Sequence, residues 1–435
     1  MRFSFVLLVL WLGSSAQGQN LYFPPLTDSE WETIDPVTLG WCDESLDSLA
    51  TFLAEADTKA FLILKDGRMV WEQYFGDFTQ DSIWYWASAG KTLTAFTVGL
   101  AQEQGYLSIF DRTNEYLPEG WTTLPPEQED SIRILHQLTM TTGLRDNPLT
   151  LNCTEPACLQ FEAEPGTRWA YHNAPYTLLR EVVEAATGFD YNVYFAAQIR
   201  NRIGMNGAWV RNGYNNVYYS NARSMARFGL LVLNEGIWDR DTIMSDDFYF
   251  KNMTSSSGTL NPSYGYLWWL NGESAYKLPR LQLSFPGPLV SAAPDDMIAG
   301  LGKNDQKLYI VPSQNLVVVR MGEASGEPLL AASNFDDQLW ERLSTLECNV
   351  TSVSEQFREQ PKLLGNPAGN QLRLHLPSAW EGAQYQLRTI QGQLVQYGTV
   401  QPNIPVEGQQ SGLYALEIRT QEGEQWVQRV VLHPQ

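Results

Sequence analysis

The pattern of hydrophobic positions predicts two β-hairpins, one near each end of a large domain. Residues 60–74 form two apolar, strand-like runs joined by Asp66-Gly67, a two-residue turn pair that tolerates positive φ. Residues 306–321 repeat this pattern, with Pro312-Ser313-Gln314 at the turn. Residues 264–270, which are rich in aromatic side chains, are a further candidate strand.

Between the hairpins the hydrophobic spacing changes from that of strands to that of helices. Apolar residues recur three and four positions apart, which is the period of an amphipathic helix. Helices are predicted over residues 92–104, 131–140, 174–188 and 221–236. A sheet assembled from both ends of one domain, with a mostly helical insert, is the simplest architecture for this order.

The pattern changes again after Cys348. Residues 349–362 are polar and predict a linker. From residue 363 to residue 435, short alternating strands separated by turn residues predict a small, separate β-sandwich.

The first 18 residues have the pattern of a secretory signal peptide. A charge at Arg2 is followed by an apolar run over residues 5–12 and by the small-residue sequence Ala16-Gln17-Gly18, after which we expect cleavage. The apolar run is too short to span a bilayer, and no other segment is long and apolar enough to do so. We expect an exported, soluble protein with no stable membrane insertion, whose large domain covers residues 19–348.

Composition narrows the range of partners. Of 435 residues, 43% are apolar and 18% are charged, as in an ordinary folded protein. The formal net charge of −20 argues against nucleic acid, because phosphate binding requires clustered Lys and Arg. Small neutral or cationic ligands remain compatible with this charge.

The four cysteines predict disulfides rather than a metal site, because the chain is expected to be exported and their spacing fits no zinc motif. Cys153 and Cys158 can close a short loop, and Cys42 and Cys348 would then bracket the large domain. Four cysteines allow three connectivities, so the pairing stays open at this stage.

Lys91 is the only formally charged residue between Asp81 and Glu103, and it lies three positions after Ser88. If a helix begins near Ser88, both side chains project from the same face. An amine activates a serine hydroxyl only when it is neutral, and neutralising a solvated lysine at pH 7 costs roughly 4 to 5 kcal/mol. Apolar surroundings lower that cost, so Ser88 is a candidate nucleophile and Lys91 its base. Backbone N–H groups at the helix start would favour a developing oxyanion.

A Ser-x-x-Lys pattern also arises by chance in a chain of this length. Ser274 and Lys277 form a second match, but Gly272 and Pro279 flank it closely and no helix can hold that pair in register. A chance origin therefore stays open for Ser88 and Lys91 on spacing alone.

Two further elements strengthen the first match. Tyr171 can serve as an acid/base, with its phenolate favoured by a charged Lys91, and Asn173 can orient a substrate amide. Gly300 and Gly302 precede a predicted strand, where backbone can approach a ligand and offer a second oxyanion donor. Each feature has a structural alternative: a half-buried aromatic for Tyr171 and a simple bend for the glycines.

Other hydrolase classes fit the sequence less well. It contains no Gly-x-Ser-x-Gly motif, no phosphate-binding loop and no histidine cluster for a catalytic metal, and nothing in it requires a cofactor. His136 is expected in a helix as a core or capping residue, and His172 is expected to face solvent from a turn.

Four segments together resemble the serine β-lactamase-related family, which includes class C β-lactamases, penicillin-binding D-peptidases, esterases and 6-aminohexanoate-oligomer hydrolases. The segments are residues 86–118, 134–144, 165–179 and 306–322. The resemblance covers about residues 30–347. It implies an α/β fold, a β-lactamase/transpeptidase-like antiparallel sheet flanked by helices with a helical subdomain. It also implies that Ser88 is the nucleophile, that Lys91 and Tyr171 transfer protons, and that Asn173, Gly300 and Gly302 bind the substrate.

The chain departs from the family at the third motif. Where β-lactamases usually have Lys-Thr-Gly, this sequence has Ala299-Gly300-Leu301-Gly302, followed by a small insertion at residues 303–305. This version is nearer to the esterase and amidase members. It weakens the case for β-lactam recognition and leaves acyl transfer intact.

The C-terminal segment resembles the sorting domain of bacterial type IX secretion. Asn366-Pro367 and a late Gly412-x-Tyr414 strand match that module, whereas Gln393 and Gln428-Arg429 replace its usual lysines. The resemblance implies secretion machinery as a partner and a secreted or cell-surface location. A carbohydrate-binding accessory domain is the alternative.

The sequence therefore predicts an exported serine hydrolase that cleaves a small ester, amide or β-lactam through an acyl-enzyme on Ser88. The alternative is a penicillin-binding-type receptor or D-peptidase that is acylated by β-lactam-like ligands.

Overall fold

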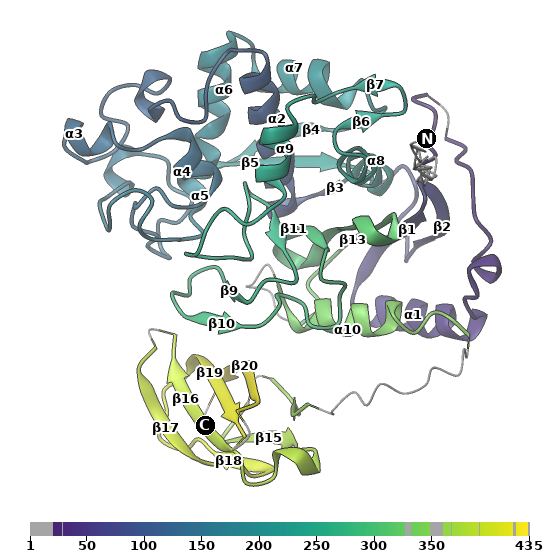
Figure 1. Ribbon diagram of the computed structural model, residues 1–435, viewed down its shortest axis with the longest axis vertical. Helices are drawn as coiled ribbons and strands as arrows, with labels where there is room; N and C mark the ends of the chain where they lie inside the picture. Colours follow the sequence, from purple (N-terminus) through teal and green to yellow (C-terminus); the bar gives the residue numbers. More distant parts are fainter. Residues whose placement is uncertain are drawn as a thin grey trace, which may run out of the picture.

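A computed structural model of the chain describes residues 21–27, 29–326, 332–348, 360–366, 368–390, 392–420 and 423–433. The predicted signal peptide and most of the predicted linker lie outside these residues. Figure 1 shows a large part with a central sheet and, below it, a small all-β part formed by the C-terminal residues.

The central sheet joins the two predicted hairpins. Its strand order is β2-β1-β13-β12-β11-β8, and every neighbouring pair is antiparallel. The strands are β1 (Thr58–Lys65), β2 (Arg68–Tyr74), β8 (Trp269–Leu270), β11 (Ile298–Gly302), β12 (Gln306–Val311) and β13 (Leu316–Gly322). Both hairpins and a sheet built from both ends of the domain are confirmed. The candidate strand over residues 264–270 is reduced to its last two residues.

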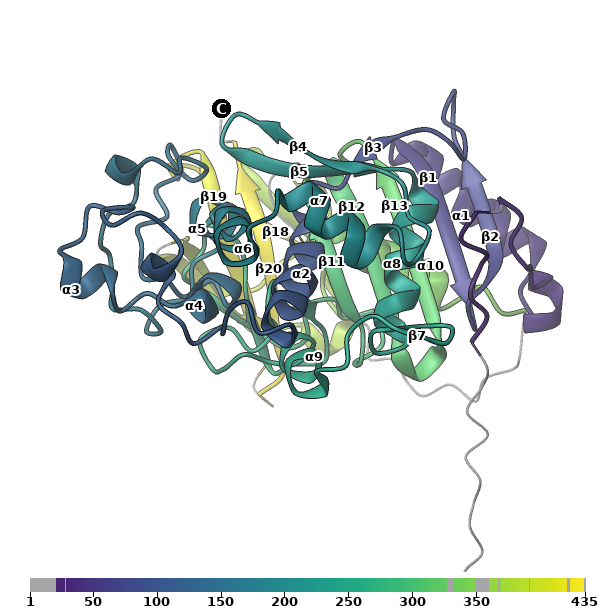
Figure 2. The same ribbon diagram turned by 90° about the horizontal axis from the view of Figure 1, so that it is seen from above.

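Helices cover both faces of this sheet, as Figures 1 and 2 show. On one face lie α2 (Lys91–Glu103) and α8 (Ala222–Leu233), close to their predicted ranges, and on the other α1 (Asp43–Glu55) and α10 (Asn334–Leu343). Helix α2 is buried all round from Lys91 to Ala101, so it forms the centre of the domain rather than a surface layer.

The predicted helices over residues 131–140 and 174–188 are interrupted in the structure. The first is only α4 (Ile134–Leu138), because Met140 takes a left-handed φ of 58° that a helix cannot continue through. The second divides into α5 (Asn173–Thr177) and α6 (Leu179–Thr187). The other helices of the large part are α3 (Pro126–Glu129), α7 (Tyr191–Phe195) and α9 (Asp247–Met253).

A second, three-stranded sheet lies beside the helical layer, with the order β3-β5-β4. Its strands are β3 (Trp84–Tyr85), β4 (Ala208–Asn212) and β5 (Asn215–Ser220). Two short hairpins complete the large part: β6 (Ile237–Trp238) with β7 (Asp241–Thr242), and β9 (Ala275–Lys277) with β10 (Ser284–Pro286).

The C-terminal strands form two small sheets around a hydrophobic core of their own, as the predicted sandwich requires. One sheet contains β14 (Lys362–Leu363), β15 (Gln371–His375) and β18 (Asn403–Pro405). The other contains β16 (Gln384–Thr389), β17 (Leu394–Thr399), β19 (Gly412–Arg419) and β20 (Gln425–Leu432). Strand β20 contacts the large part, where Arg429 donates to the backbone oxygen of Ala332 at 2.7 Å.

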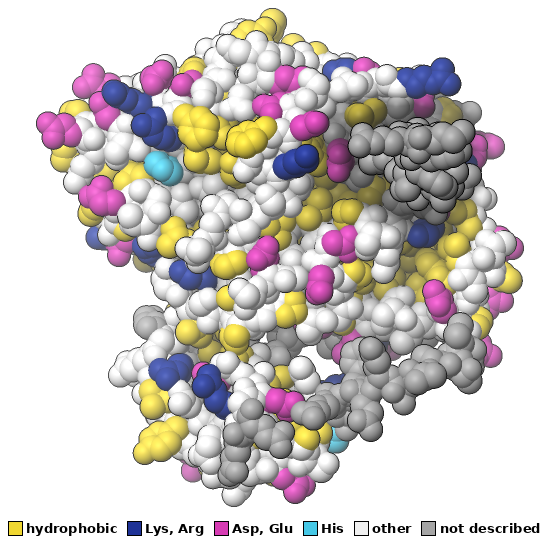
Figure 3. All heavy atoms as spheres, viewed as in Figure 1, with side chains coloured by type: hydrophobic (Ala, Val, Ile, Leu, Met, Phe, Trp, Pro, Cys, Tyr) yellow, Lys and Arg dark blue, Asp and Glu magenta, His cyan; other side chains and the backbone are white. Residues whose placement is uncertain are grey.

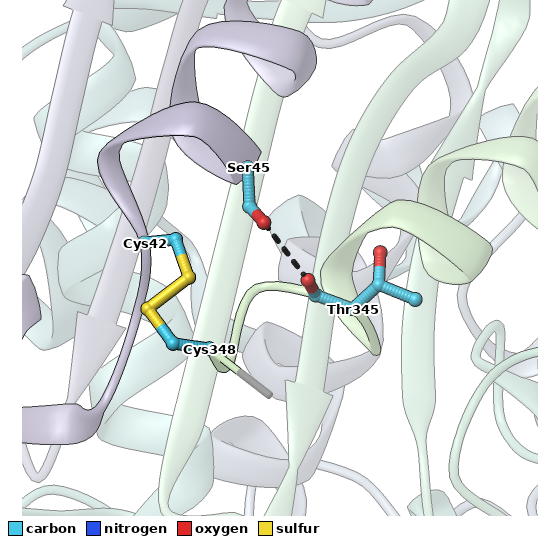
Figure 4. Close-up of a disulfide and its surroundings, with 4 residues drawn as sticks. All are labelled: Cys42, Ser45, Thr345 and Cys348. Atoms are coloured by element: carbon cyan, nitrogen blue, oxygen red, sulfur yellow. Dashed lines mark hydrogen bonds between the residues drawn. A yellow bond between two sulfur atoms is a disulfide. The ribbon is translucent and has the colours of Figure 1, made fainter. Parts of the chain in front are cut away.

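The structure forms both disulfides that the sequence analysis favoured. Cys42 and Cys348 join the start of α1 to the chain just beyond α10, next to a hydrogen bond from Ser45 to the backbone oxygen of Thr345 (Figure 4). Cys153 and Cys158 close a five-residue step in the helical part. Among the described residues, no helix has the length and apolar character that crossing a membrane demands.

A fully buried ion cluster supports the end of the central sheet. The Lys307 Nζ atom on β12 lies 2.9 Å from an Asp336 carboxylate oxygen and 3.2 Å from one of Asp305. The Tyr309 hydroxyl donates to Asp336 at 2.5 Å. Because both carboxylates are out of water, they depend on the ammonium group between them and on the nearby buried Arg320.

Lys307→Met should therefore be strongly destabilising. Removing the Lys307 ammonium leaves two buried carboxylates with only Arg320 to offset their charge, and we expect the free energy of unfolding to fall by about 3–5 kcal/mol. Urea denaturation followed by far-UV circular dichroism measures this loss. The control is Arg145→Gln, which breaks an exposed pair with Glu162 and should cost less than about 1 kcal/mol. Equal losses in the two variants would contradict the assigned role of the cluster.

Candidate active site

Ser88 lies on a tight 3₁₀ turn, η2 (Ala87–Gly90), that leads directly into α2. Ala87 takes a φ of 48°, a left-handed conformation that costs a non-glycine residue of order 1 kcal/mol. The preceding residue holds the turn in place: the Trp86 N–H donates to the Tyr218 oxygen at 2.9 Å, and its indole Nε1 donates to Ser220 at 2.7 Å. The helix thus begins three residues later than a start at Ser88, yet the turn still brings Ser88 and Lys91 together.

The Lys91 amine is within hydrogen-bond distance of the Ser88 hydroxyl, at 3.0 Å. It also donates to the Asn173 side-chain oxygen at 2.9 Å, and the Asn173 amide in turn donates to Asn152 at 2.7 Å. The Lys91 side chain is almost completely buried, whereas Ser88 is only half-buried. The base is therefore shielded from water while the hydroxyl stays reachable.

Burial lowers the pKa of Lys91 to about 7. Removal from water disfavours the ammonium form. The rings of Tyr171 and Tyr176 lie 5.0 Å and 4.3 Å from Nζ, and this contact by itself favours the charged amine. Near neutral pH a large fraction of the Lys91 side chains is neutral, and a neutral amine has the lone pair that a general base needs.

Tyr171 completes the group from a different part of the chain. Its hydroxyl lies near Ser88, and its ring stacks on Trp269 with centroids 5.7 Å apart. The expectation of a phenolate at Tyr171 is wrong, because burial raises the pKa of this phenol well above its usual value. The proton therefore stays on Tyr171 near neutral pH, whereas the Lys91 amine is partly neutral.

A cavity of about 400 Å³ opens over Ser88 and Lys91. Beyond the predicted Asn173, its walls include residues that the sequence analysis did not assign to the site. Asparagines and tyrosines predominate among them: Tyr85, Asn152, Tyr176, Asn216, Tyr219 and Asn304. Tyr85 belongs to an aromatic cluster visible in the sequence, but no periodic signal marks the asparagines. A larger cavity, of about 630 Å³, lies beside Trp41 and Trp340, and the described residues that line it include no paired nucleophile and base.

Gly300 and Gly302 lie on β11, packed against η2. A Cβ atom at Gly302 would come within 2.6 Å of the Trp86 backbone oxygen, so only glycine allows this approach of strand and turn. The next two residues, Lys303 and Asn304, line the cavity instead. A direct role of the two glycines in oxyanion binding stays a prediction.

The two histidines near these motifs are structural in different ways. His136 accepts a hydrogen bond from the Arg133 N–H at 3.1 Å and so caps α4, as expected. His172 is buried, contrary to the expectation of a solvent-facing residue, and burial lowers its pKa to about 4. Its backbone enters α5 directly behind Tyr171, which draws its side chain inward. Within the described ranges no group of three or more His, Cys, Asp or Glu side chains is arranged to hold a metal.

Comparison with known proteins agrees with this geometry. The sequence profile named Beta-lactamase matches residues 53–337, which is more than half of the chain. The chain belongs to the beta-lactamase family. Members of this family are serine hydrolases that act on small-molecule amides and esters.

Relatives of known sequence are distant. An uncharacterized protein of Alkalihalophilus pseudofirmus is 26% identical over 314 residues, which cover 63% of this chain and 87% of that protein. Penicillin-binding protein 4* of Bacillus subtilis is 30% identical over 148 residues, and the match spans only 31% of its length.

Solved structures support the family fold and, at these identities, the fold alone. A candidate beta-lactamase from Bacteroides dorei is 18% identical, with a TM-score of 0.55 over 70% of this chain and 99% of that one. A candidate 6-aminohexanoate-dimer hydrolase from Bacillus anthracis is 20% identical, with a TM-score of 0.54 over 68% of this chain and 80% of that one. A penicillin-binding protein from Bacillus halodurans is 16% identical, with a TM-score of 0.50 over 69% of this chain and 99% of that one.

Proposed function

We propose that this beta-lactamase family protein is an exported serine hydrolase that cleaves an ester or amide through an acyl-enzyme on Ser88. The observation that carries the proposal is the 3.0 Å contact between the Ser88 hydroxyl and an amine whose pKa burial lowers to about 7. A serine hydroxyl is a weak nucleophile until a neighbouring base accepts its proton, and Lys91 is placed to be that base.

In the proposed acylation step, Ser88 Oγ attacks the substrate carbonyl carbon while its proton moves to Lys91 Nζ. Tyr171 gives its phenolic proton to the leaving oxygen or nitrogen and recovers a proton from the Lys91 ammonium. The carbonyl oxygen becomes an oxyanion that backbone N–H groups at η2 and along the β11 edge stabilise. In deacylation, water enters and the same groups transfer protons in the reverse order.

Asn173 has a positioning role in this proposal and a binding role as well. Its side-chain oxygen accepts from Lys91, which fixes the amine beside Ser88. Its amide nitrogen reaches Asn152, and both residues border the cavity, so a substrate that displaces Asn152 finds a free donor.

Simple esters and open-chain amides are the proposed substrates rather than β-lactams. The sequence at β11 lacks the Lys-Thr-Gly with which β-lactamases bind a substrate carboxylate. The solved relative from Bacillus anthracis carries the name of an amide hydrolase, which agrees with this choice. The alternative, a receptor that is acylated without turnover, has the same polar groups at the site.

Covalent labelling separates Ser88 from the chance match in the chain. A fluorophosphonate probe should label the wild type, and Ser88→Ala should lose labelling together with at least about a thousandfold of nitrophenyl acetate hydrolysis. Ser274→Ala is the matched control, because Ser274 has a lysine at the same spacing but is exposed and precedes the half-buried strand β9. Labelling that survives in Ser88→Ala would refute the proposal. A single burst of nitrophenol without turnover would favour the receptor.

The pH dependence tests the assignment of the base. Because only the neutral amine accepts the Ser88 proton, kcat/KM should rise with pH, with a midpoint at about pH 7, and level off above about pH 8. The initial rates of nitrophenyl acetate hydrolysis between about pH 5 and pH 10 give this profile. The residual rate of the Lys91→Met variant should not show this rise around pH 7. A midpoint near the ordinary lysine value of ~10.4 would contradict the assignment.

We also propose export through the signal peptide and the C-terminal sorting domain. In a bacterium with type IX secretion, the full chain should reach the surface or the medium with Gln19 as its first residue. A chain that ends at residue 362 should remain in the periplasm. Fractionation and mass spectrometry of the N-terminus check both points, and equal release of the two chains would contradict a sorting role.

A further inference from the structure

Asn216 on β5 is a buried amide without a partner at the mouth of the catalytic cavity. Its side chain is only 8% exposed, and it lines the cavity that contains Ser88 and Lys91. Among the residues that the structure describes, no group hydrogen-bonds to the Asn216 side chain. The polar atoms of this side chain are accessible from the cavity, so a ligand that enters it can supply the missing hydrogen-bond partners.

The hairpin that carries Asn216 is fixed to the nucleophile turn. Strand β5 packs against both η2 and α5, and the Tyr218 backbone oxygen accepts the Trp86 N–H at 2.9 Å. The neighbouring strand is fixed by Asn192, whose amide accepts from and donates to the Trp209 backbone at 2.8 Å and 3.0 Å. Asn216 is therefore held at a set position relative to Ser88 rather than on a loose loop.

The lining of this cavity differs in charge from the rest of the protein. Acidic side chains are spread over the face shown in Figure 3, and the formal net charge is −20. In contrast, none of the described residues that line the cavity is acidic. Six are asparagines: Asn152, Asn173, Asn212, Asn215, Asn216 and Asn304. Together with the exposed Lys303, such a lining offers neutral donors and acceptors and one cation, but no carboxylate for a cationic substrate.

We infer that Asn216 is a specificity-determining residue that pairs with a secondary amide on the acyl side of the substrate. A primary amide such as the Asn216 side chain presents an acceptor and a donor in one plane. A secondary amide can pair with both, because its N–H donates to the acceptor and its carbonyl oxygen accepts from the donor. The substrate class is accordingly a peptide-like or oligoamide acyl donor without positive charge. This inference rests on the proposed acyl transfer at Ser88 and adds the group that the acyl chain must carry.

Three nitrophenyl esters of equal chain length test the inference. N-acetylglycinate carries a secondary amide, 4-oxopentanoate keeps only the acceptor, and pentanoate has neither. The quantity compared is the ratio of kcat/KM for N-acetylglycinate to that for pentanoate, measured in each variant. Because the intrinsic reactivity of an ester is the same for every variant, a change in this ratio reports the contact with the enzyme.

Asn216→Leu should lower the ratio about tenfold, which is the effect of one or two neutral hydrogen bonds. The 4-oxopentanoate ester should fall between the two. Asn252→Leu is the control, because Asn252 is a half-buried asparagine on α9 that lies outside the cavity lining. An unchanged ratio in Asn216→Leu would overturn the inference. The inference would also be overturned if the wild type preferred acetylated monosaccharides and Asn216→Leu lost that preference. The group recognised would then be a hydroxyl.

A binding measurement keeps the inference separate from the proposed catalysis. In Ser88→Ala, which leaves the binding groups in place, titration with N-acetylglycinamide should shift the side-chain ¹H–¹⁵N signals of Asn216, assigned by their loss in the Ser88→Ala/Asn216→Leu variant. Absence of a shift at saturating amide would overturn the inference even where esters are hydrolysed. A shift in a protein that hydrolyses no ester would support the binding role while the proposed function fails.

Discussion

The burial of one amine is the constraint on which the rest of this structure depends. Moving the Lys91 pKa from 10.5 to about 7 corresponds to about 5 kcal/mol of disfavoured charge. That cost is tolerated because Lys91 opens a helix that is buried on every side and packed within the domain. Had the same Ser-x-x-Lys spacing fallen on a surface helix, the amine would stay charged.

Three segments far apart in sequence meet around that amine, and each is fixed by a different kind of interaction. The turn that carries Ser88 depends on Trp86 and its two hydrogen bonds to Tyr218 and Ser220 of β5. Asn173 reaches Asn152, which directly precedes the Cys153–Cys158 disulfide, so this cross-link restrains one wall of the cavity. On the opposite side, Asn304 donates to the Tyr85 hydroxyl at 2.8 Å, and the next residue, Asp305, is held in the buried ion cluster.

The catalytic group was more predictable from the sequence than the cavity around it. Ser88, Lys91, Tyr171 and Asn173 meet in space as the motifs predict, because each depends on local spacing plus one tertiary contact. The protonation of Tyr171 was not predictable, since burial outweighs any influence of Lys91 and burial is a property of the packed domain. The splitting of two predicted helices has the same origin: Met140 takes a left-handed φ that its sequence neighbours do not signal. The asparagines of the cavity come from loops and a hairpin whose approach no periodic pattern encodes.

This difference arises because the groups for proton transfer and the residues that line the cavity are positioned by different parts of the fold. Proton transfer requires a few atoms at short range, and a helical turn with one facing residue supplies them. Substrate choice requires a surface, and here β4–β5, the turn after β11 and the loop around Asn152 contribute to it separately. Each of these segments can change without disturbing the contact between Ser88 and Lys91. A beta-lactamase fold with the Lys-Thr-Gly replaced and a cavity lined by neutral amides can therefore keep the acyl-transfer chemistry and direct it to a different carbonyl compound.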